Sequence, residues 1–498
     1  MNYSNIGVLL NACHKLDLSC KQKLLCYYKS HVSTVISRFS YSLNHSRYFC
    51  SSEVSSQSHD DGITVLPSPQ EVTIILRKNE FNKEFTIGSV KSYDSNQLAS
   101  NDPIEDTRSE AICRLLLGVF DGHGGPACAQ VISKRLLSYI AAALLPTNLI
   151  NNFKKDASSD ALLETFNDRV EIVQELKEHY ERSFKEYVKE LGESKNLGQD
   201  IGGSLEKAIM KLDSDLSKEV LDPYDKTGTV NPKTLSVALS GAVACVCHID
   251  GPNLYVANVG DCNAVIGTKM DDEDEWLANK ITKEHNSDNY DELKRIWNEH
   301  PESERKTVIR RDRLLGELAP LRSLGDYRYK WTADTLSKVA VPAIGSRAIP
   351  ANYHTPPYLT AKPDVYHHRL TPKDKFLIVA SDGLWDMITP LQAVKLVGEH
   401  MKGKVFFNPL KLPRKNIQLG DINELLTHRK QSLKSKPKDR NAATHLIRHA
   451  IGGTEYGVDH SRLAHLLSLS PDVSRMFRDD VTVTVVFFDS EHLRQCPA

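Results

Sequence analysis

Short apolar runs and amphipathic stretches follow one another without regular alternation from about residue 64 onward. Runs rich in β-branched residues predict strands at residues 72–76, 115–120, 243–249, 254–259, 376–380 and 481–488. Apolar positions at helical spacing predict helices at residues 127–144, 204–216, 291–299 and 391–400. Asp250-Gly251 separates two neighbouring runs and predicts a hairpin. The pattern therefore favours an α+β fold, antiparallel sheets covered by helices, over a doubly wound parallel sheet.

Three parts of the chain depart from this pattern. Residues 331–363 are rich in proline and residues 402–440 are strongly basic, so both are predicted to be surface insertions. Residues 1–52 contain many serines, six Lys or Arg residues and a single acidic residue, Asp17. Such a segment resembles a mitochondrial transit peptide, with a disordered leader as the alternative. We expect a linker at residues 53–63, one globular domain at 64–490 and a tail at 491–498.

Charge and hydropathy exclude some partners. The formal net charge of the chain is -1, so no overall field favours nucleic acid or an anionic membrane surface. No apolar run approaches the roughly 18 residues of a membrane span. We therefore expect no nucleic-acid partner and no integral membrane segment, and local charges must carry the function.

The ten cysteines are scattered and form no C-x-x-C pair, which does not favour a disulfide framework in so long a chain. Cys245 and Cys247 fall on one face of a predicted strand, which favours buried core thiols over a metal-binding pair. No cysteine is followed six positions later by an arginine. This excludes the phosphatases that use such a cysteine as a covalent nucleophile.

Acidic residues gather where predicted strands end. An Asp-Gly pair after a strand is usually only a turn. Several carboxylates at one end of a sheet, however, would repel one another unless cations held them. Hard oxygen ligands without a His or Cys cluster suit Mg²⁺ or Mn²⁺ better than structural Zn²⁺. The acidic positions are Glu105, Asp106, Asp121, Asp261, Asp326, Asp382, Asp479 and Asp480.

An ordered set of motifs resembles one known family. The motifs are FDGHGG at 120–125, SGA at 240–242, ANVGD at 257–261, LAPLRSLGD at 318–326, SDGLWD at 381–386 and RDDVT at 478–482, preceded by the acidic pair at 105–106. Together they resemble the metal-dependent, type 2C protein serine/threonine phosphatases over roughly residues 71–488. The resemblance implies a four-layer αββα sandwich, in which two antiparallel sheets pack face to face with helices outside.

The resemblance also implies a cofactor and its ligands. Two Mg²⁺ or Mn²⁺ ions would occupy the site, with a weaker third ion. Asp121 would bridge the first two ions and Gly122 would offer its carbonyl oxygen to one of them. Asp382 and Asp479 would bind the other ion. Asp261, together with Asp382, would hold the third.

Further roles follow from the same resemblance. Glu105 and Asp106 would hold metal-bound water. A water bridging the metals would attack phosphorus, and His123 would protonate the leaving serine oxygen, with a hydrogen-bonded turn histidine as the alternative. Asn101 stands where many relatives have an arginine that grips the substrate phosphate. Asn263 also departs from the family pattern, and the sequence offers no reason for it.

Four segments, at residues 93–98, 313–316, 350–361 and 441–450, resemble the mitochondrial pyruvate dehydrogenase phosphatases within this family. This resemblance implies a location in the mitochondrial matrix and phosphoserine on the E1 subunit of the pyruvate dehydrogenase complex as substrate. It also implies docking to the core of that complex and a possible regulatory subunit. The insertions around residues 353–358 and 402–440 are candidate docking surfaces, with inert surface loops as the alternative. The alternatives are a type 2C phosphatase with another substrate and an inactive binding scaffold.

Overall fold

The computed structural model describes most of the chain from residue 66 to residue 496. The described ranges are 66–85, 88–111, 114–153, 162–163, 165–166, 174–193, 200–221, 230–269, 275–406, 418–433, 436–455 and 457–496. The predicted leader at 1–52 and the predicted linker at 53–63 lie outside these ranges.

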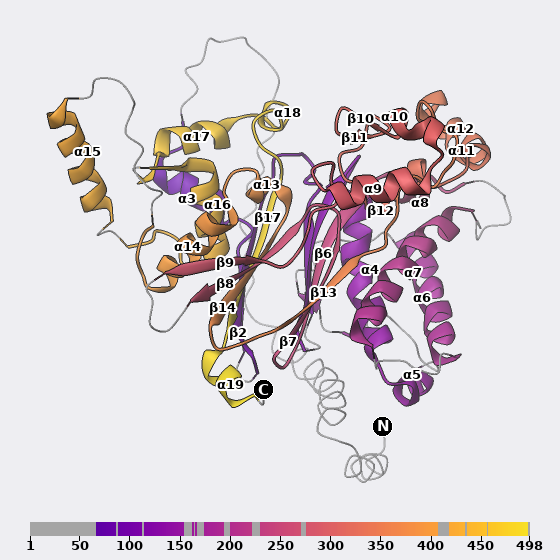
Figure 1. Cartoon of the computed structure of the whole chain (residues 1–498), viewed down its shortest axis with the longest axis horizontal. Coiled ribbons are helices and arrows are strands. Elements are labelled where there is room, and N and C mark those ends of the chain that lie inside the picture. The colour runs from indigo at the N-terminus through magenta and orange to yellow at the C-terminus, as the bar shows by residue number, and fades with distance from the viewer. Residues whose placement is uncertain are drawn as a thin grey trace, which may run out of the picture.

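Two antiparallel sheets form the centre of the molecule (Figure 1). The first sheet has the strand order β1 (Phe81–Glu84), β2 (Val90–Leu98), β17 (Val481–Phe488), β14 (Asp374–Ala380), β8 (Asn263–Lys269) and β9 (Trp276–Lys280). The second has the order β13 (Asp364–Arg369), β7 (Asn253–Val259), β6 (Gly241–Asp250), β4 (Leu116–His123), β3 (Thr107–Ala111) and β5 (Thr165–Phe166), and β12 (Leu324–Gly325) pairs with β6. Two short ladders join β10 (Ile309–Arg310) to β11 (Arg313–Leu314) and β15 (Gly453–Thr454) to β16 (Gly457–Val458).

Helices cover the outer faces of both sheets (Figure 1). The second sheet is covered by α4 (Ala127–Leu144), α5 (Thr147–Phe153), α6 (Gln174–Glu193), α7 (Ile201–Leu221) and α8 (Pro232–Leu239). The first is covered by α3 (Pro69–Arg77), α14 (Pro390–Met401), α16 (Ala442–Gly452) and α17 (His460–Ser468). The remaining helices are α9 (Tyr290–Glu299), α10 (Arg305–Val308), α11 (Ala333–Val339), α12 (Val341–Ile344), α13 (Asp382–Trp385), α15 (Leu419–Ser432), α18 (Pro471–Ser474) and α19 (Ser490–Gln495).

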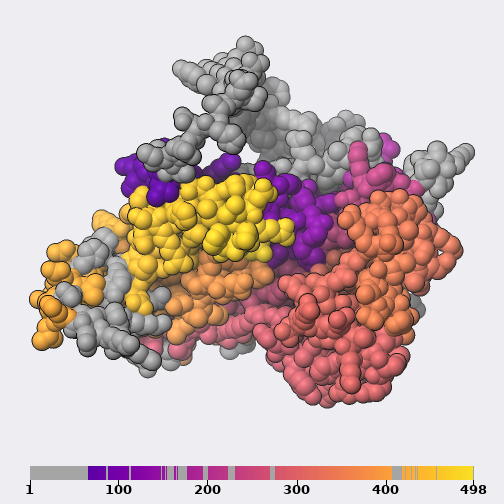
Figure 2. All heavy atoms as spheres, turned by 90° about the horizontal axis from the view of Figure 1, so that it is seen from above, coloured from indigo at the N-terminus to yellow at the C-terminus, as the bar shows by residue number. Residues whose placement is uncertain are grey.

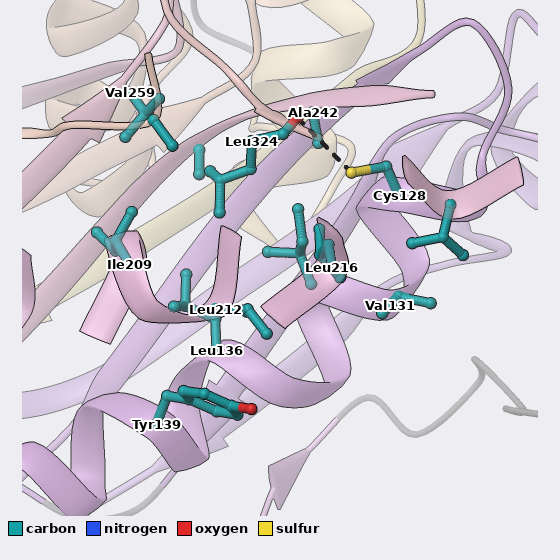
Figure 3. Packing of buried hydrophobic residues seen from close by; sticks show 14 of the residues in the cluster. Cys128, Val131, Leu136, Tyr139, Ile209, Leu212, Leu216, Ala242, Val259 and Leu324 are labelled. Carbon is teal, nitrogen blue, oxygen red and sulfur yellow. Dashed lines mark hydrogen bonds between the residues drawn. The ribbon is translucent and has the colours of Figure 1, made fainter. Parts of the chain in front are cut away.

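Three hydrophobic clusters fill the three spaces between these four layers. The cluster between the sheets includes Val119 of β4 and Val379 of β14. A second lies between the first sheet and its helices. The third joins the second sheet to α4 and α7, and Figure 3 shows part of it around Leu136 and Leu212. The α+β sandwich predicted from the motifs is thereby confirmed.

Several local predictions are also confirmed. The two runs around Asp250-Gly251 form the antiparallel hairpin of β6 and β7. Cys245 and Cys247 are fully buried on β6, in the cluster between the sheets. Among the described residues, no helix has both the length and the apolar character needed to cross a membrane.

The strand predicted at residues 72–76 is wrong, because this segment lies in α3. Its β-branched residues outweighed a helix start signal just upstream. Ser68 caps the helix and exchanges hydrogen bonds with Glu71 in a capping box, and Pro69 occupies the first turn. Val72 and Leu76 are buried four residues apart, which is the spacing of one helix face.

The two predicted insertions differ from each other. The segment 331–363 contains α11 and α12 and is partly built into the core. Tyr353 is 8% exposed and Tyr358 is 1% exposed, so both rings are buried, whereas His354 and Pro357 between them are exposed. Docking through residues 353–358 stays a prediction that the buried rings make less favourable. In 402–440, the described part includes α15, which projects from the body in Figure 1. At the C-terminus, part of the expected tail forms α19, whose Leu493 is buried.

Candidate active site

Asp121 lies near the end of β4, where Val243 of β6 is its register partner. The next residue, Gly122, is buried, and a Cβ atom built there would overlap the carbonyl oxygen of Glu105. Only glycine allows the acidic pair at 105–106 to come so close to this strand. The second sheet therefore brings two acidic motifs together through one close backbone contact.

Asp382 lies across from Asp121, at the start of α13 after β14 of the first sheet. The two carboxyl groups lie within hydrogen-bonding reach of each other. Burial, together with the charges of Asp106 and Asp382, raises the pKa of Asp121 well above its usual range. Burial and the charge of Asp261 raise the pKa of Asp382 to about 7. Among the described residues, Asp382 Oδ1 is a buried oxygen without a hydrogen-bond partner.

Asp106 is buried beside this pair. The hydroxyl of Ser381 donates to Asp106 Oδ2 at 2.8 Å. Burial and the nearby Asp480 raise the pKa of Asp106 well above its usual range. The carboxyl groups are thus packed at the ends of both sheets with too little compensating positive charge.

Asp480 organises the loop that carries the acidic pair. Its Oδ2 accepts hydrogen bonds from the backbone N–H of Glu105 at 2.8 Å and from the Asn101 side-chain amide at 3.0 Å. Its Oδ1 accepts from the backbone N–H of Asn101 at 2.9 Å and from that of Ser100. Asp480 is 2% exposed, so these bonds fix the 100–106 loop against the start of β17.

Glu105 and Asp479 lie at the edge of the cluster. Glu105 Oε1 accepts from the backbone N–H of Gly125 at 2.7 Å, and its Oε2 lies 3.6 Å from a guanidinium nitrogen of Arg475. Asp479 is exposed, and its Oδ1 accepts from the backbone N–H of Asp480 at 2.7 Å. Asp479 therefore lies on the solvent side of the cluster.

Asp261 follows β7 and interacts with the same cluster. Burial raises the pKa of Asp261 to about 6, and the charges of Glu284 and Asp386 act in the same direction. Asn263 is buried beside it. The Asn263 amide donates to Glu284 Oε1 at 2.7 Å and to the Asp261 carbonyl oxygen at 3.2 Å. Asn263, whose departure from the family pattern the sequence did not explain, therefore links Glu284 to the turn at Asp261.

His123 pairs with an aspartate from a distant segment. His123 Nε2 lies 2.6 Å from Asp326 Oδ2, and the hydroxyl of Ser323 donates to the same oxygen at 2.6 Å. Burial alone would lower the pKa of His123, but the charge and hydrogen bond of Asp326 outweigh it, and the pKa is raised. A side chain on Gly241 would overlap both partners, so the glycine of the SGA motif makes room for the pair.

The donor set fits hard divalent cations, although the described residues contain no group of three or more His, Cys, Asp or Glu side chains in ready-made metal-binding geometry. The fit rests on two observations, the unpartnered Asp382 Oδ1 and its contact with the Asp121 carboxyl group. Two buried carboxyl groups in contact must share a proton or a cation. Carboxylate oxygens are ligands of Mg²⁺ and Mn²⁺.

The structure thus brings Asp106, Asp121, Asp261 and Asp382 into one interacting cluster, with Asp479 at its solvent side. The sequence motifs contained Asp326 and Asp480, but gave neither of them a role in the site. Glu284 was missed entirely. Their importance comes from contacts between segments far apart in the chain, for which a single sequence gives no signal.

Comparison with known proteins gives consistent results. The family described as protein phosphatase 2C matches residues 147–419. The chain is 42% identical over 453 residues to the human mitochondrial pyruvate dehydrogenase (acetyl-transferring) phosphatase 1, covering 85% of this chain and 83% of that one. It is 39% identical over 476 residues to the human phosphatase 2 of the same name, covering 89% and 88%. A protein phosphatase 2C homolog of Schizosaccharomyces pombe is 33% identical over 442 residues, covering 84% and 86%.

Proposed function

Because the chain belongs to the protein phosphatase 2C family and is a protein serine/threonine phosphatase, we propose that its substrate is phosphoserine on the E1 subunit of the pyruvate dehydrogenase complex. Support comes from the two human relatives, which are named pyruvate dehydrogenase (acetyl-transferring) phosphatase 1 and 2 and match more than four fifths of the chain. Removal of the phosphate would reactivate the complex. Those relatives are also named mitochondrial, which agrees with the acid-poor leader and supports a location in the mitochondrial matrix.

We infer that the cluster holds two Mg²⁺ or Mn²⁺ ions and a weaker third. Asp121 and the Gly122 carbonyl oxygen would serve the first ion, and Asp121, Asp382 and Asp479 the second. Asp261 and Asp382 would serve the third. Bound cations would neutralise the carboxylates and activate a water for attack on phosphorus. The single observation that carries this proposal is the contact between the Asp121 and Asp382 carboxyl groups, with Asp382 Oδ1 buried and unpartnered within the described residues.

The remaining residues then have defined tasks. Glu105 and Asp106 would orient water at the cluster by accepting its hydrogen bonds. His123 would protonate the leaving serine oxygen, and the Asp326 carboxylate would keep the ring oriented and protonated for this step. The Asn101 amide already donates to Asp480. We therefore assign to Asn101 the support of the 100–106 loop, and propose that another group makes the direct contact with the phosphate.

Docking to the core of the complex would compensate for a weak grip on the phosphate, because it raises the local substrate concentration. The segment 402–440 is the better candidate surface. Its helix α15 carries the exposed side chains of Leu419 (85% exposed) and Leu426 (48% exposed). A regulatory subunit could use the same surface.

The test compares turnover of the phosphorylated complex with turnover of a free phosphoserine peptide of the same sequence, with Mg²⁺ and after chelation. We expect activity only with metal, and a kcat/KM for the complex at least about tenfold higher, since a docking contact of about 1.4 kcal/mol already gives that factor. Undiminished turnover in EDTA would contradict the metal assignment. Absence of any phosphatase activity would favour the inactive scaffold, and equal use of both substrates would favour another physiological substrate.

A further inference from the structure

The segment between α18 and β17 presents three exposed side chains beside the carboxylate cluster. The Arg475 side chain is 60% exposed, Met476 is 80% exposed and Phe477 is 62% exposed. They lie immediately before Arg478, which is followed by Asp479, a proposed metal ligand. We name residues 475–477 the cluster rim. Seen from above, the C-terminal part of the chain lies against the N-terminal part on this face (Figure 2).

The backbone on both sides of the cluster rim is fixed. The Ser100 hydroxyl donates to the Arg478 carbonyl oxygen at 2.8 Å, and the Arg478 guanidinium donates to the Ala99 carbonyl oxygen at 2.6 Å. Ser474 is buried, and its carbonyl oxygen accepts from the Phe477 N–H at 2.9 Å. The exposed side chains therefore stand on a segment that is attached to the same 99–106 loop as Asp480 and the acidic pair.

Arg475 carries a charge that is only loosely held. One guanidinium nitrogen lies 3.6 Å from Glu105 Oε2, which is beyond hydrogen-bonding distance. Within the described part of the chain, the Arg475 side chain makes no hydrogen bond. An exposed ion pair of this kind contributes little to stability. Neighbouring Arg478, by contrast, already donates to backbone carbonyl oxygens at Ala99 and Asp479.

A phosphoryl dianion that approaches this cluster would be bound more tightly if a side-chain cation at the edge acted together with the proposed metal ions. The Asn101 amide cannot supply one, because it is neutral and already donates to Asp480. A guanidinium group, in contrast, offers two parallel N–H donors that match phosphate oxygens. Arg475 is adjacent to Glu105 and free to turn toward a dianion, so its position and its chemistry both fit this need.

We propose that Arg475 binds the phosphoryl group of the substrate, and that Met476 and Phe477 contact the substrate chain beside the phosphoserine. The inference rests on the proposed phosphatase function and adds its phosphate-binding residue. The occupant of the cluster rim is thus an extended phosphoserine segment with an apolar residue near the phosphate. Positive charge next to exposed apolar surface is complementary to such a segment.

The test uses the full chain with Mg²⁺ and three readouts: turnover of p-nitrophenyl phosphate, turnover of a phosphoserine peptide, and inhibition by inorganic phosphate. Loss of a charge-assisted contact predicts that Arg475→Ala raises the phosphate inhibition constant and both KM values by about ten- to a hundredfold, with a smaller change in kcat. Arg475→Lys should lose less than Arg475→Ala, because lysine keeps the positive charge but lacks the two parallel N–H donors of the guanidinium group. Phe477→Ser should raise the KM of the peptide more than that of the small substrate.

Arg494→Ala is the matched control, since Arg494 is a similarly exposed arginine, 49% exposed, in an ion pair on α19. It should leave all three readouts unchanged. If the phosphate inhibition constant of Arg475→Ala stays within about twofold of wild type while the enzyme is active, the inference is overturned and the proposed function stands. If the wild-type chain has no metal-dependent activity, the proposed function itself fails. Should Arg475→Ala fold poorly in a melting experiment, Arg475→Gln keeps the stem packing and gives the same comparison.

Discussion

Two buried groups of charged residues lie in different parts of the molecule, one among the helices that cover the second sheet and one at the ends of both sheets, and they are built in opposite ways. In the first group, between α4, α6 and α7, each described carboxylate has a cation. Arg135 donates to both oxygens of Glu219, at 2.6 Å and 2.9 Å, and Lys211 donates to Asp215 at 3.0 Å. Burial would lower the pKa of Arg135, but Glu219 outweighs it and the pKa is raised. We call this group the helix network.

In the carboxylate cluster, the charges are of one sign and compete with each other. Asp121 and Asp382 are in contact, and their pKa values are raised by burial and by neighbouring carboxyl groups. In the helix network, cations of the protein itself compensate Glu219 and Asp215, although burial still raises the pKa of Asp215. In the carboxylate cluster no described cation compensates Asp121 and Asp382, and the cations proposed to bind there would supply the missing charge at the cost of a less stable metal-free fold. Both groups are buried, so burial alone does not distinguish them. What distinguishes a structural buried charge from a functional one is whether the protein itself supplies a partner of opposite charge.

The largest effect is expected in the helix network. Arg135→Ala would leave Glu219 buried without its cation, which should destabilise the fold by about 3–5 kcal/mol. Activity per folded molecule should change less than about twofold, since the contact is remote from the cluster. Denaturant unfolding and kcat, measured on the same sample, check both statements. Replacing both partners, as Arg135→Met with Glu219→Leu, should restore most of the stability, and failure of that double variant would contradict the account.

Removal of one carboxylate from the cluster should lower activity strongly and leave stability unchanged or higher, which is the reverse of the outcome for Arg135→Ala. Asp382→Asn deletes a proposed ligand and also deletes a buried like charge. We expect kcat/KM to fall at least about a hundredfold at limiting Mg²⁺, by analogy with the loss of groups that support metals. The melting temperature in EDTA should stay equal or rise. Asp334→Asn, at an exposed aspartate of α11, is the control. A variant with near wild-type turnover at limiting metal would show that Asp382 is not a ligand.

Metal binding should stabilise the fold only through the carboxylate cluster. Mg²⁺ at about 100 times its Kd should add about 2.7 kcal/mol to the free energy of unfolding. The same shift in melting temperature is expected for Arg135→Ala, because the helix network does not bind the ion. Asp382→Asn should show less than half of the shift. An equal Mg²⁺ shift in all three proteins would place the bound ion elsewhere.

The pH dependence of the metal-free protein follows from the raised pKa values. The pKa of Asp382 is about 7 in the fold against 3.8 for the unperturbed group, and that of Asp261 is about 6. Their neutral forms are therefore favoured by folding, so their contribution to stability is present below pH 4 and is lost as the pH rises through 6 to 7. In EDTA, the melting temperature should fall between pH 5 and pH 8 by a few degrees. Asp382→Asn should flatten this slope, and a slope equal to wild type would contradict the assignment.

The sequence predicted the parts of this molecule that depend on local pattern. β4, β14 and β17 each coincide with an apolar run, and the acidic residues beside these strands are in the site. One local prediction failed at α3, because the β-branched run at residues 72–76 was given more weight than the capping box of Ser68 and Glu71, which is also a local pattern. The motifs also assigned no role to Asp480, because the five backbone and side-chain donors of that carboxylate lie about 380 positions away. Such contacts depend on tertiary packing, which no local pattern records.

The smallest effect is expected at Asn263. This residue lies beside Glu284, the carboxylate near the cluster that has protein donors of its own, as the carboxylates of the helix network do. Asn263 is 3% exposed, and its amide donates to Glu284 Oε1, while its own oxygen accepts from the Thr282 hydroxyl at 3.1 Å. Lys280 also donates to Glu284 Oε1, at 2.6 Å. Burial alone would raise the pKa of Glu284. The bonds from Lys280 and Asn263 outweigh burial, lower this pKa and keep the carboxylate charged beside Asp261.

Asn263→Ala removes one of these donors but leaves Lys280 in place. The cost should therefore be that of a single buried hydrogen bond, about 0.5–1.5 kcal/mol in the free energy of unfolding. The Mg²⁺ concentration for half-maximal activity should change by no more than about threefold, since a residual 0.6 kcal/mol corresponds to that factor. Lys280→Ala is the matched control, because it removes the exposed donor to the same oxygen and should cost less stability. If Asn263→Ala instead abolished activity with the fold intact, Asn263 would act on the substrate directly, and its bond to Glu284 would not explain why asparagine occupies this position.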